Sequence, residues 1–274
     1  MMNLEGIRLR PNQLAFVNRF VDACKTDERV VAAFLGGSNA KGRADQFSDI
    51  DLCVITTDNA RQDFYNQREA FLRSFGELVF FEDFGIPNIA YFIFADGTEG
   101  ELNFGSEGHL DQIHSGPFRT LLDKKNVLAE AVFSEEVADP ARQLEELRHN
   151  IDWFWHEMSH FVTAIGRGKL WWARGQLEAL RAKCVNLARL QNNFVDMGVG
   201  DEPYFKIENE INVEKLAPLE TTFCLMEKAA MLESAWLIVR FYQTRVADLC
   251  QTHEIPYPHS LETVMLERLE RLSK

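Results

Sequence analysis

The chain has 274 residues, of which 46% are hydrophobic and 26% are charged, and such a composition is typical of a soluble globular protein of two domains. Its formal net charge of −13 and the lack of a lysine and arginine cluster argue against a nucleic-acid partner. No stretch approaches the roughly 20 apolar residues of a membrane span, and the N-terminus does not resemble a secretion signal, so we expect a cytoplasmic protein with no membrane partner.

Two apolar runs of strand length follow an amphipathic helix that we predict over residues 11–25. The runs cover residues 30–35 and 50–55, and turn residues bound each of them. Because side chains alternate along a strand, Asp49 and Asp51 point to the same face. Two adjacent carboxylates repel each other unless a cation lies between them, and magnesium prefers oxygen ligands. The pair therefore predicts a metal site.

A glycine–serine turn, Gly37-Ser38, lies close to the end of the first predicted strand. Gly37 allows a ligand to approach the backbone, and Ser38 adds a hydroxyl beside amide groups that can face phosphate oxygens. Taken singly, these features fit an ordinary turn and solvated carboxylates at the start of a strand. The combination of strand, turn, ten-residue spacer and Asp-x-Asp strand instead predicts a nucleotide and metal site.

The chain continues with a predicted helix over residues 59–75 and then with signals for a hairpin. A turn at residues 95–98 separates the last two strand candidates. Glu101 follows this turn and supplies a third carboxylate, whereas Glu99 lies nearer the turn and fits a solvated charge. The strand candidates of this region are residues 78–81, 91–94 and 101–104.

Strand signals stop after an acidic stretch at residues 134–140, in which we expect Asp139 to cap a helix and Pro140 to lie in its first turn. The sequence thus predicts an α/β N-terminal domain over residues 1–137, with a mixed sheet flanked by helices, and an all-α helical bundle over residues 138–274. The predicted helices of the second half are residues 141–165, 169–193, 219–251 and 260–272, with breaks at Gly166-Arg167-Gly168 and near residues 198–201.

The run from Gly37 to Asp49 and the following Asp51 resemble the signature of the polymerase-beta-like nucleotidyltransferases. Within that superfamily they look most like the antibiotic-modifying branch, especially lincosamide nucleotidyltransferases and streptomycin-type aminoglycoside adenylyltransferases. The resemblance implies that Asp49 and Asp51 hold Mg²⁺. It also implies that Ser38 and Ser48 contact the nucleotide phosphates.

Glu101 lies in a segment, Gly100 to Gly105, that resembles the strand carrying the catalytic glutamate in these adenylyltransferases. By this resemblance Glu101 is a metal ligand and the general base. We also count Lys41 among the nucleotide-binding candidates, together with Lys206, which lies in a loop where related enzymes place a phosphate-binding lysine.

The resemblance implies magnesium-dependent transfer of a nucleotide monophosphate, AMP from ATP or another nucleoside triphosphate, with release of pyrophosphate. The acceptor would be a hydroxyl of a small cationic molecule such as a lincosamide or aminoglycoside antibiotic, which the acidic chain would attract. Antibiotic resistance is the implied role. The helical bundle would complete the cleft and form the interface of a homodimer.

Two other functions fit parts of the sequence. One is a nucleotidyltransferase-fold module that modifies or sequesters a protein partner, as in a toxin–antitoxin pair. The other is a zinc hydrolase, because His156, Glu157 and His160 spell HExxH and Glu178 could serve as a distant third ligand. The motif is short, however, and Thr163 stands where a metzincin-type continuation needs glycine.

Trp171 and Trp172 could stack on a nucleotide or an antibiotic, but aromatic residues at helical spacing are more often core or dimer contacts, and we favour the core. Arg174, Arg181 and Lys183 follow on the same predicted helix and could reach phosphates. For each of these three cations, a solvated helix face is the simpler expectation.

Overall fold

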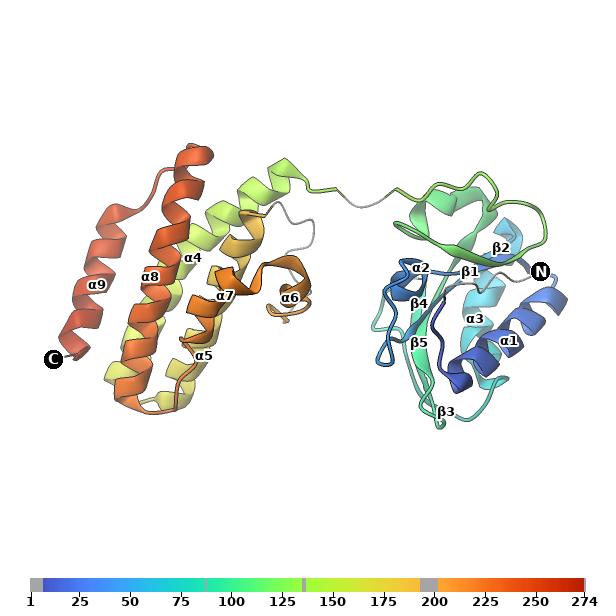
Figure 1. The fold of residues 1–274 in the computed structure, drawn as a ribbon, viewed down its shortest axis with the longest axis horizontal. Coiled ribbons are helices and arrows are strands. Elements are labelled where there is room, and N and C mark those ends of the chain that lie inside the picture. Colours follow the sequence, from blue (N-terminus) through green and yellow to red (C-terminus); the bar gives the residue numbers. More distant parts are fainter. Residues whose placement is uncertain (1–6, 87, 135–136, 193–201, 274) are drawn as a thin grey trace. The chain divides into compact units, whose positions relative to one another are not determined.

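The computed structural model describes residues 7–86, 88–134, 137–192 and 202–273. The chain divides into two compact units, Met1–Glu136 and Val137–Lys274, which we call the N-terminal and C-terminal units (Figure 1). The first contains a mixed sheet with helices, and the regular elements described in the second are helices, which confirms the predicted fold class. Within the described ranges, no helix is both long enough and apolar enough to cross a membrane.

The sheet of the N-terminal unit has six strands in the order β3-β4-β5-β2-β1-β6. Strands β2 and β5 pair in parallel, and the other neighbouring strands pair antiparallel. The strands are β1 (Val30–Leu35), β2 (Ile50–Thr56), β3 (Leu78–Glu82), β4 (Ile89–Phe94), β5 (Glu99–Ser106) and β6 (Arg119–Asp123). The helices are α1 (Pro11–Thr26), α2 (Gly37–Ala40) and α3 (Arg61–Arg73), with 3₁₀ turns η1 (Asp58–Ala60) and η2 (Glu107–Gln112).

Helices α1 and α3 contribute side chains to a hydrophobic core on one face of this sheet. Phe16 of α1 and Phe64 of α3 are fully buried there. Strand residues such as Leu52 and Leu102 complete the same cluster. Each buried aromatic or aliphatic side chain of this kind contributes roughly 1.5–3 kcal/mol to folding. This core therefore stabilises the strands that carry the acidic residues.

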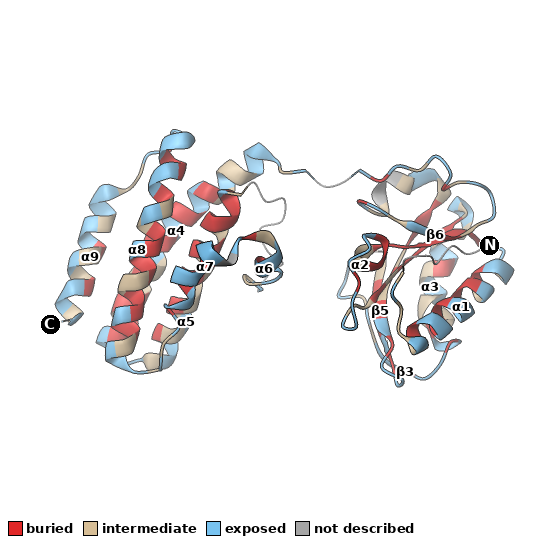
Figure 2. Ribbon diagram, in the orientation of Figure 1, coloured by how far each residue is buried: buried red, intermediate tan, exposed pale blue. Residues whose placement is uncertain are grey.

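The opposite face of the sheet is covered over β1 and β2 by the chain that follows β5 and β6. Leu128 and Phe133 from this chain pack with Phe34 of β1 and Cys53 of β2 in a second, smaller cluster. The colouring by burial shows buried residues along the strands and on the helices α1 and α3 (Figure 2). The two clusters together hold β1 and β2 between apolar layers.

The strands predicted from the sequence are all present, and the structure adds β6, which we did not predict. The predicted helix over residues 59–75 begins as η1 and continues as α3. The predicted helix over residues 219–251 is wrong at its start, because one helix ends at Glu220 and the next begins at Lys228. The predicted break near residues 198–201 lies outside the described residues.

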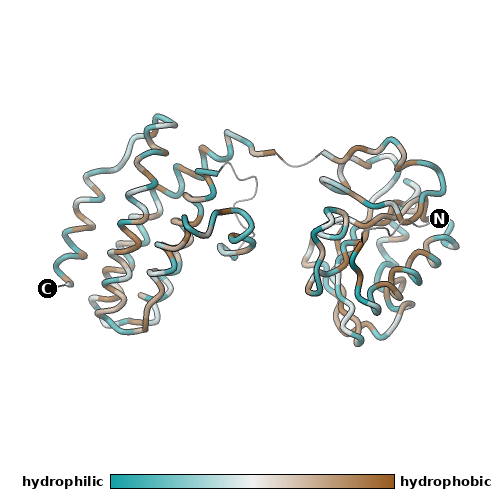
Figure 3. The backbone as a smooth tube through the Cα atoms, viewed as in Figure 1, coloured by the Kyte–Doolittle hydropathy of each residue, from teal (hydrophilic) through white to brown (hydrophobic). Residues whose placement is uncertain are grey.

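The C-terminal unit consists of amphipathic helices, along which apolar and polar positions alternate (Figure 3). As predicted, Asp139 caps the first of them by accepting a hydrogen bond of 2.9 Å from the amide of Ala141, and Pro140 follows the cap. The helices are α4 (Pro140–Gly166), α5 (Leu170–Leu190), α6 (Ile207–Glu210), α7 (Val213–Glu220), α8 (Lys228–Thr252) and α9 (His259–Ser273).

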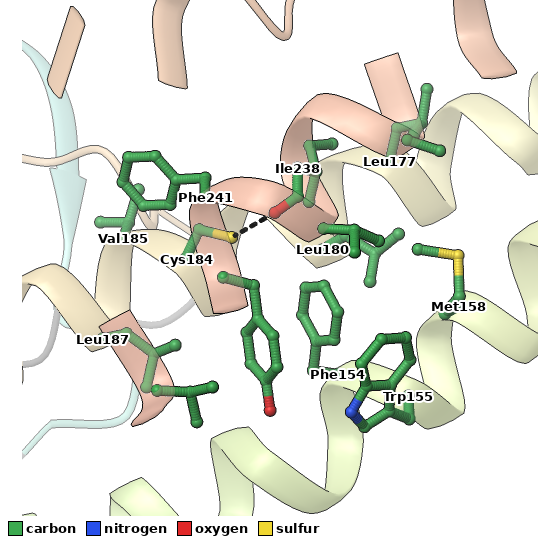
Figure 4. Close-up of a cluster of buried hydrophobic side chains, with 14 of the residues drawn as sticks. Phe154, Trp155, Met158, Leu177, Leu180, Cys184, Val185, Leu187, Ile238 and Phe241 are labelled. Atoms are coloured by element: carbon green, nitrogen blue, oxygen red, sulfur yellow. Dashed lines mark hydrogen bonds between the residues drawn. The ribbon is translucent and has the colours of Figure 1, made fainter. Parts of the chain in front are cut away.

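Aromatic stacking joins α4 to α8 in the core of this unit. The rings of Phe154 and Tyr242 stack with centroids 3.6 Å apart and planes 7° apart. Trp155 lies beside them and donates a hydrogen bond of 3.1 Å to the hydroxyl of Tyr257. Phe154 and Trp155 lie among aliphatic side chains of α5 and α8 (Figure 4).

A buried arginine explains why the predicted helix over residues 219–251 is interrupted. Arg181 is 0% exposed, so its expected place on a solvated helix face is wrong. It forms an ion pair of 2.6 Å with Glu178 and a hydrogen bond of 2.8 Å to the hydroxyl of Thr222. Arg181 donates a second hydrogen bond of 3.0 Å to the carbonyl of Thr222 and so fixes the segment between α7 and α8 outside either helix.

We expect Phe154→Ala to lower the free energy of unfolding of the C-terminal unit by about 3–5 kcal/mol, because it leaves a cavity beside Tyr242. Denaturant titration followed by circular dichroism measures the change. Trp153→Ala, at an exposed neighbouring position, should change the same quantity by about 0.5 kcal/mol or less. Equal losses in the two variants would contradict the assignment of this stack to the core.

Candidate active site

Three carboxylates meet at the end of the parallel strand pair. Asp51 of β2 and Glu101 of β5 are direct neighbours in the register of the two strands, and Asp49 lies just before β2. One carboxylate oxygen from each of the three lies within 4.8 Å of the other two. All three side chains are partly exposed, so a ligand can reach them from solvent.

The glycine–serine turn presses against this cluster. Gly37 has a φ of +54°, and a Cβ atom there would lie 1.6 Å from Oδ2 of Asp51. The amide of Gly36 donates a hydrogen bond of 2.9 Å to the carbonyl of Asp51. The turn therefore requires glycine at position 37 both for its backbone conformation and for its lack of a side chain.

Two buried amide side chains fix the backbone before β2, and the sequence analysis missed both. Asn39 donates a hydrogen bond of 3.1 Å from Nδ2 to the carbonyl of Asp49. Gln13 of α1 donates one of 2.8 Å from Nε2 to the carbonyl of Ser48. Asn39 lies within the glycine–serine run and could have been inferred as a loop-fixing residue, whereas nothing in the sequence connects Gln13 to this loop.

The two serines of the predicted phosphate site differ in their hydrogen bonding. The hydroxyl oxygen of Ser38 is buried and makes no hydrogen bond within the part of the chain that the structure describes. The hydroxyl of Ser48 accepts a bond of 2.9 Å from the amide of Asp45 and donates one of 3.2 Å to its carboxylate. Ser38 is thus ready to donate to a ligand, whereas Ser48 must first leave Asp45.

Tyr91 of β4 belongs to this site and was missed as well. It is the register partner of Glu101 on the antiparallel side of β5. A hydrogen bond to Glu101, burial and the charges of Asp49 and Asp51 raise the pKa of Tyr91 to about 12. The predicted turn at residues 95–98 did not reveal this pairing, because counting outward from it places residue 92 opposite residue 101. In the structure residue 94 already pairs with residue 98, and this shift of one residue brings Tyr91 opposite Glu101.

The two predicted nucleotide-binding lysines lie in different units of the chain. Lys41 is exposed in the loop after α2. Lys206 belongs to the C-terminal unit, where it has a φ of +56° and its ammonium lies 4.3 Å from the ring centroid of Phe205. Their roles stay predictions.

The HExxH segment lacks a third metal ligand within the described residues. The rings of His156 and His160 lie 4.6 Å apart on α4, but the group formed by Asp49, Asp51 and Glu101 is the one described cluster of three such ligands. Glu178 is held by ion pairs of 2.7 Å to Arg174 and 2.6 Å to Arg181. The structure therefore gives the zinc interpretation no support.

The expectation that Trp171 and Trp172 lie in the core is wrong. Trp171 is 84% exposed and Trp172 is 38% exposed. Both lie in the first turn of α5, where one side of the helix faces solvent.

The acidic cluster fits a divalent cation. Three carboxylates at this separation repel one another strongly, and a hard cation removes that cost by binding oxygen from each. Neither Asp49 nor Glu101 forms an ion pair with a lysine or arginine in the described ranges. The donor set suits Mg²⁺, which accepts a few carboxylates together with phosphate oxygens.

A family model described as streptomycin adenylyltransferase matches residues 12–272 of the chain. Among solved structures, the chain is similar to an aminoglycoside 6-adenyltransferase from Bacillus subtilis. That match has 16% sequence identity and a TM-score of 0.44, and it covers 96% of this chain and 99% of the other. No curated protein matches the sequence.

We expect Gly37→Ala to displace the carboxylate of Asp51 and to weaken Mn²⁺ binding at this cluster, as measured by calorimetric titration. The control is Gly42→Ala, because Gly42 also has a positive φ of +68° but has no atom within 4 Å of the added Cβ. Both variants carry a backbone cost of about 1–2 kcal/mol. Loss of Mn²⁺ affinity in Gly42→Ala but not in Gly37→Ala would contradict the role of this contact.

Proposed function

The chain belongs to the streptomycin adenylyltransferase family, and on this premise we propose that it transfers AMP from ATP to a hydroxyl group of an aminoglycoside. The observation that carries the proposal is the convergence of Asp49, Asp51 and Glu101 within 4.8 Å beside the turn at Gly37. Transfer between a triphosphate and a hydroxyl needs concentrated positive charge for the phosphates and a base for the hydroxyl. The three carboxylates would hold a divalent cation that supplies this charge, and one of them can act as the base.

The three carboxylates would hold Mg²⁺, which supplies positive charge to the phosphate oxygens when bound. Ser38 would donate its unused hydroxyl hydrogen to a phosphate oxygen, and Gly37 would let the phosphates approach the backbone. Ser48, Lys41 and Lys206 remain proposed phosphate contacts. The buried, unpaired oxygen of Ser38 is the best-supported contact among them.

In the proposed reaction the acceptor oxygen attacks the α-phosphorus of ATP. The new bond joins this oxygen to phosphorus, and the bond from the α-phosphorus to the bridging oxygen breaks, so that pyrophosphate leaves. Glu101 accepts the proton of the attacking hydroxyl. The hydrogen bond from Tyr91 holds one side of the Glu101 carboxylate in place while the proton is taken.

The acceptor class follows from the family and from charge. Aminoglycosides carry protonated amines, and the chain has a net charge of −13 that would attract them. We therefore place an aminoglycoside ahead of a lincosamide, which serves as the comparison acceptor in the test. Antibiotic inactivation would be the biological result.

The proposal includes a cytoplasmic location and a homodimer. The five cysteines are free, as in a reducing compartment where ATP is also present. The exposed aromatic side chains Trp171 and Trp172 of α5 offer a surface for a second copy. Light scattering of the purified protein measures its oligomeric state.

The deciding experiment incubates the protein with labelled ATP, Mg²⁺ and a panel of streptomycin, kanamycin and lincomycin. We expect pyrophosphate release and label transfer with an aminoglycoside. Label that appears on a protein instead would favour a module that modifies a protein partner. Modification of an antibiotic in the absence of any nucleotide would contradict the proposal outright.

Glu101→Gln should lower kcat by about a hundredfold to ten-thousandfold, because glutamine cannot accept the proton. Binding of ATP, measured by calorimetry, should persist in the variant. Glu77→Gln is the control, since Glu77 is an exposed carboxylate just before β3 in the same unit. Full turnover in Glu101→Gln would remove the general base from the proposal.

Removal of divalent cations with a chelator should abolish transfer, and added Mg²⁺ should restore it. Asp49→Asn should raise the Mg²⁺ concentration needed for half-maximal rate by at least about tenfold, because one charged ligand is lost. The measurement is a Mg²⁺ titration of the initial rate. A rate independent of divalent cations would refute the proposed use of the acidic cluster.

A further inference from the structure

Two rows of paired side chains run from the carboxylates toward the edge strand β3. Directly opposed residues of neighbouring strands place their side chains on the same face of a sheet. Both rows therefore lie on the face that carries the acidic cluster. From β3 inward, the first row is Glu82, Tyr91, Glu101 and Asp51, and the second is Phe80, Ile93 and Glu99.

This part of the sheet exposes aromatic rings to solvent. Phe84, in the loop after β3, is 60% exposed, and its ring centroid lies 5.4 Å from that of Tyr91 and 6.5 Å from that of Phe80. Phe80 and Ile93 are exposed as well. We call Phe80, Glu82, Phe84, Tyr91 and Ile93 the β3–β4 face.

The β3–β4 face and the glycine–serine turn lie on opposite sides of the acidic cluster. The sheet order β3-β4-β5-β2-β1 places β4 beyond Glu101, whereas the turn follows β1 and presses on Asp51. If the triphosphate lies on the turn, the acceptor must reach Glu101 from the side of β4. The β3–β4 face is thus the surface that an acceptor meets beside the base.

Glu82 gives this aromatic surface a negative charge. Its Oε1 accepts hydrogen bonds of 3.0 Å from the amides of Asp83 and Phe84, so the same side chain fixes the loop that presents the Phe84 ring. Asp83 is paired with Arg68, whereas Glu82 forms no ion pair within the described ranges. Exposed aromatic rings beside an unneutralised carboxylate suit a molecule with apolar C–H faces and an ammonium group.

We propose that the β3–β4 face binds the acceptor as an amino sugar of more than one ring. One ring packs on Phe84 and Tyr91, its ammonium group pairs with Glu82, and a hydroxyl of the same molecule reaches Glu101. Strands β3 and β5 are two strand spacings apart, about 10 Å, which exceeds the reach of one small sugar. This inference rests on the proposed function, since that function makes Glu101 the base.

The test measures streptomycin, kanamycin and lincomycin binding by calorimetry, and acceptor and ATP KM values, in Phe84→Ala and Glu82→Gln. We expect Phe84→Ala to raise the Kd and KM of the bound aminoglycoside about fivefold through lost ring contacts. Glu82→Gln keeps Oε1 as an acceptor for the amides of the loop. We expect it to raise the Kd and KM of the aminoglycoside about threefold at low salt and by less at high salt. ATP KM should change less than twofold.

Val132→Ala is the control, because Val132 is 88% exposed in the same unit and does not belong to the β3–β4 face. It should leave every constant within twofold. Weaker aminoglycoside binding in both variants would support the inference even if no AMP transfer occurred, and in that case the proposed function alone would fail.

Three results would overturn the inference. A rise in the KM of ATP, without a rise in the Kd or KM of the aminoglycoside, would assign this face to the nucleotide. A change of oligomeric state in Phe84→Ala, seen by light scattering, would assign it to a second copy of the chain. Unchanged Kd and KM values for the acceptor in both variants would also refute the inference, as would a wild-type protein that binds no compound of the panel. In either case, label transfer to a hydroxyl group would leave the proposed function standing.

Discussion

The parallel pairing of β2 with β5 is the constraint on which the site depends. It sets Asp51 directly opposite Glu101, and the chain direction of β2 adds Asp49 at the same edge. Like charges at such short range cost free energy in a folded protein unless something binds them. The apolar layers on either side of β1 and β2 offset this free energy through packing. The core therefore keeps the three carboxylates close together, although their mutual repulsion favours their separation.

The groups around the carboxylates act mainly on backbone and orientation. Asn39 and Gln13 hold the chain before β2 by its carbonyl oxygens and leave the carboxylate of Asp49 free of those contacts. Tyr91 keeps its proton because its pKa lies far above neutrality, so it can donate to Glu101 and adds no fourth negative charge. The site therefore combines a rigid frame with a small number of exposed acidic oxygens, as positioning-based catalysis requires.

Local patterns were enough to predict most of the fold and the acidic cluster. Apolar runs marked β1 and β2, and the Asp-x-Asp spacing placed Asp49 and Asp51 on one face before any partner strand was known. Features that depend on distant contacts were not predictable in this way. Gln13 reaches the loop from α1, and buried Arg181 ends a helix by binding Thr222, forty-one positions away. Tyr91 lies between these cases, because the hairpin was visible in the sequence but its register, which pairs Tyr91 with Glu101, differs by one residue from that of the predicted turn.

The long excursion of the chain between β2 and β5 has a consequence for how the protein reaches its native state. Asp51 and Glu101 are fifty positions apart in sequence, and α3, β3 and β4 lie between them. Non-local parallel pairing is slow to form, because the conformational entropy of the connecting chain is lost before the stabilising contacts between the strands are made. A nascent or partly ordered polypeptide without this pairing cannot gather its ligand oxygens, so cation affinity should emerge late in refolding and report completion of the sheet.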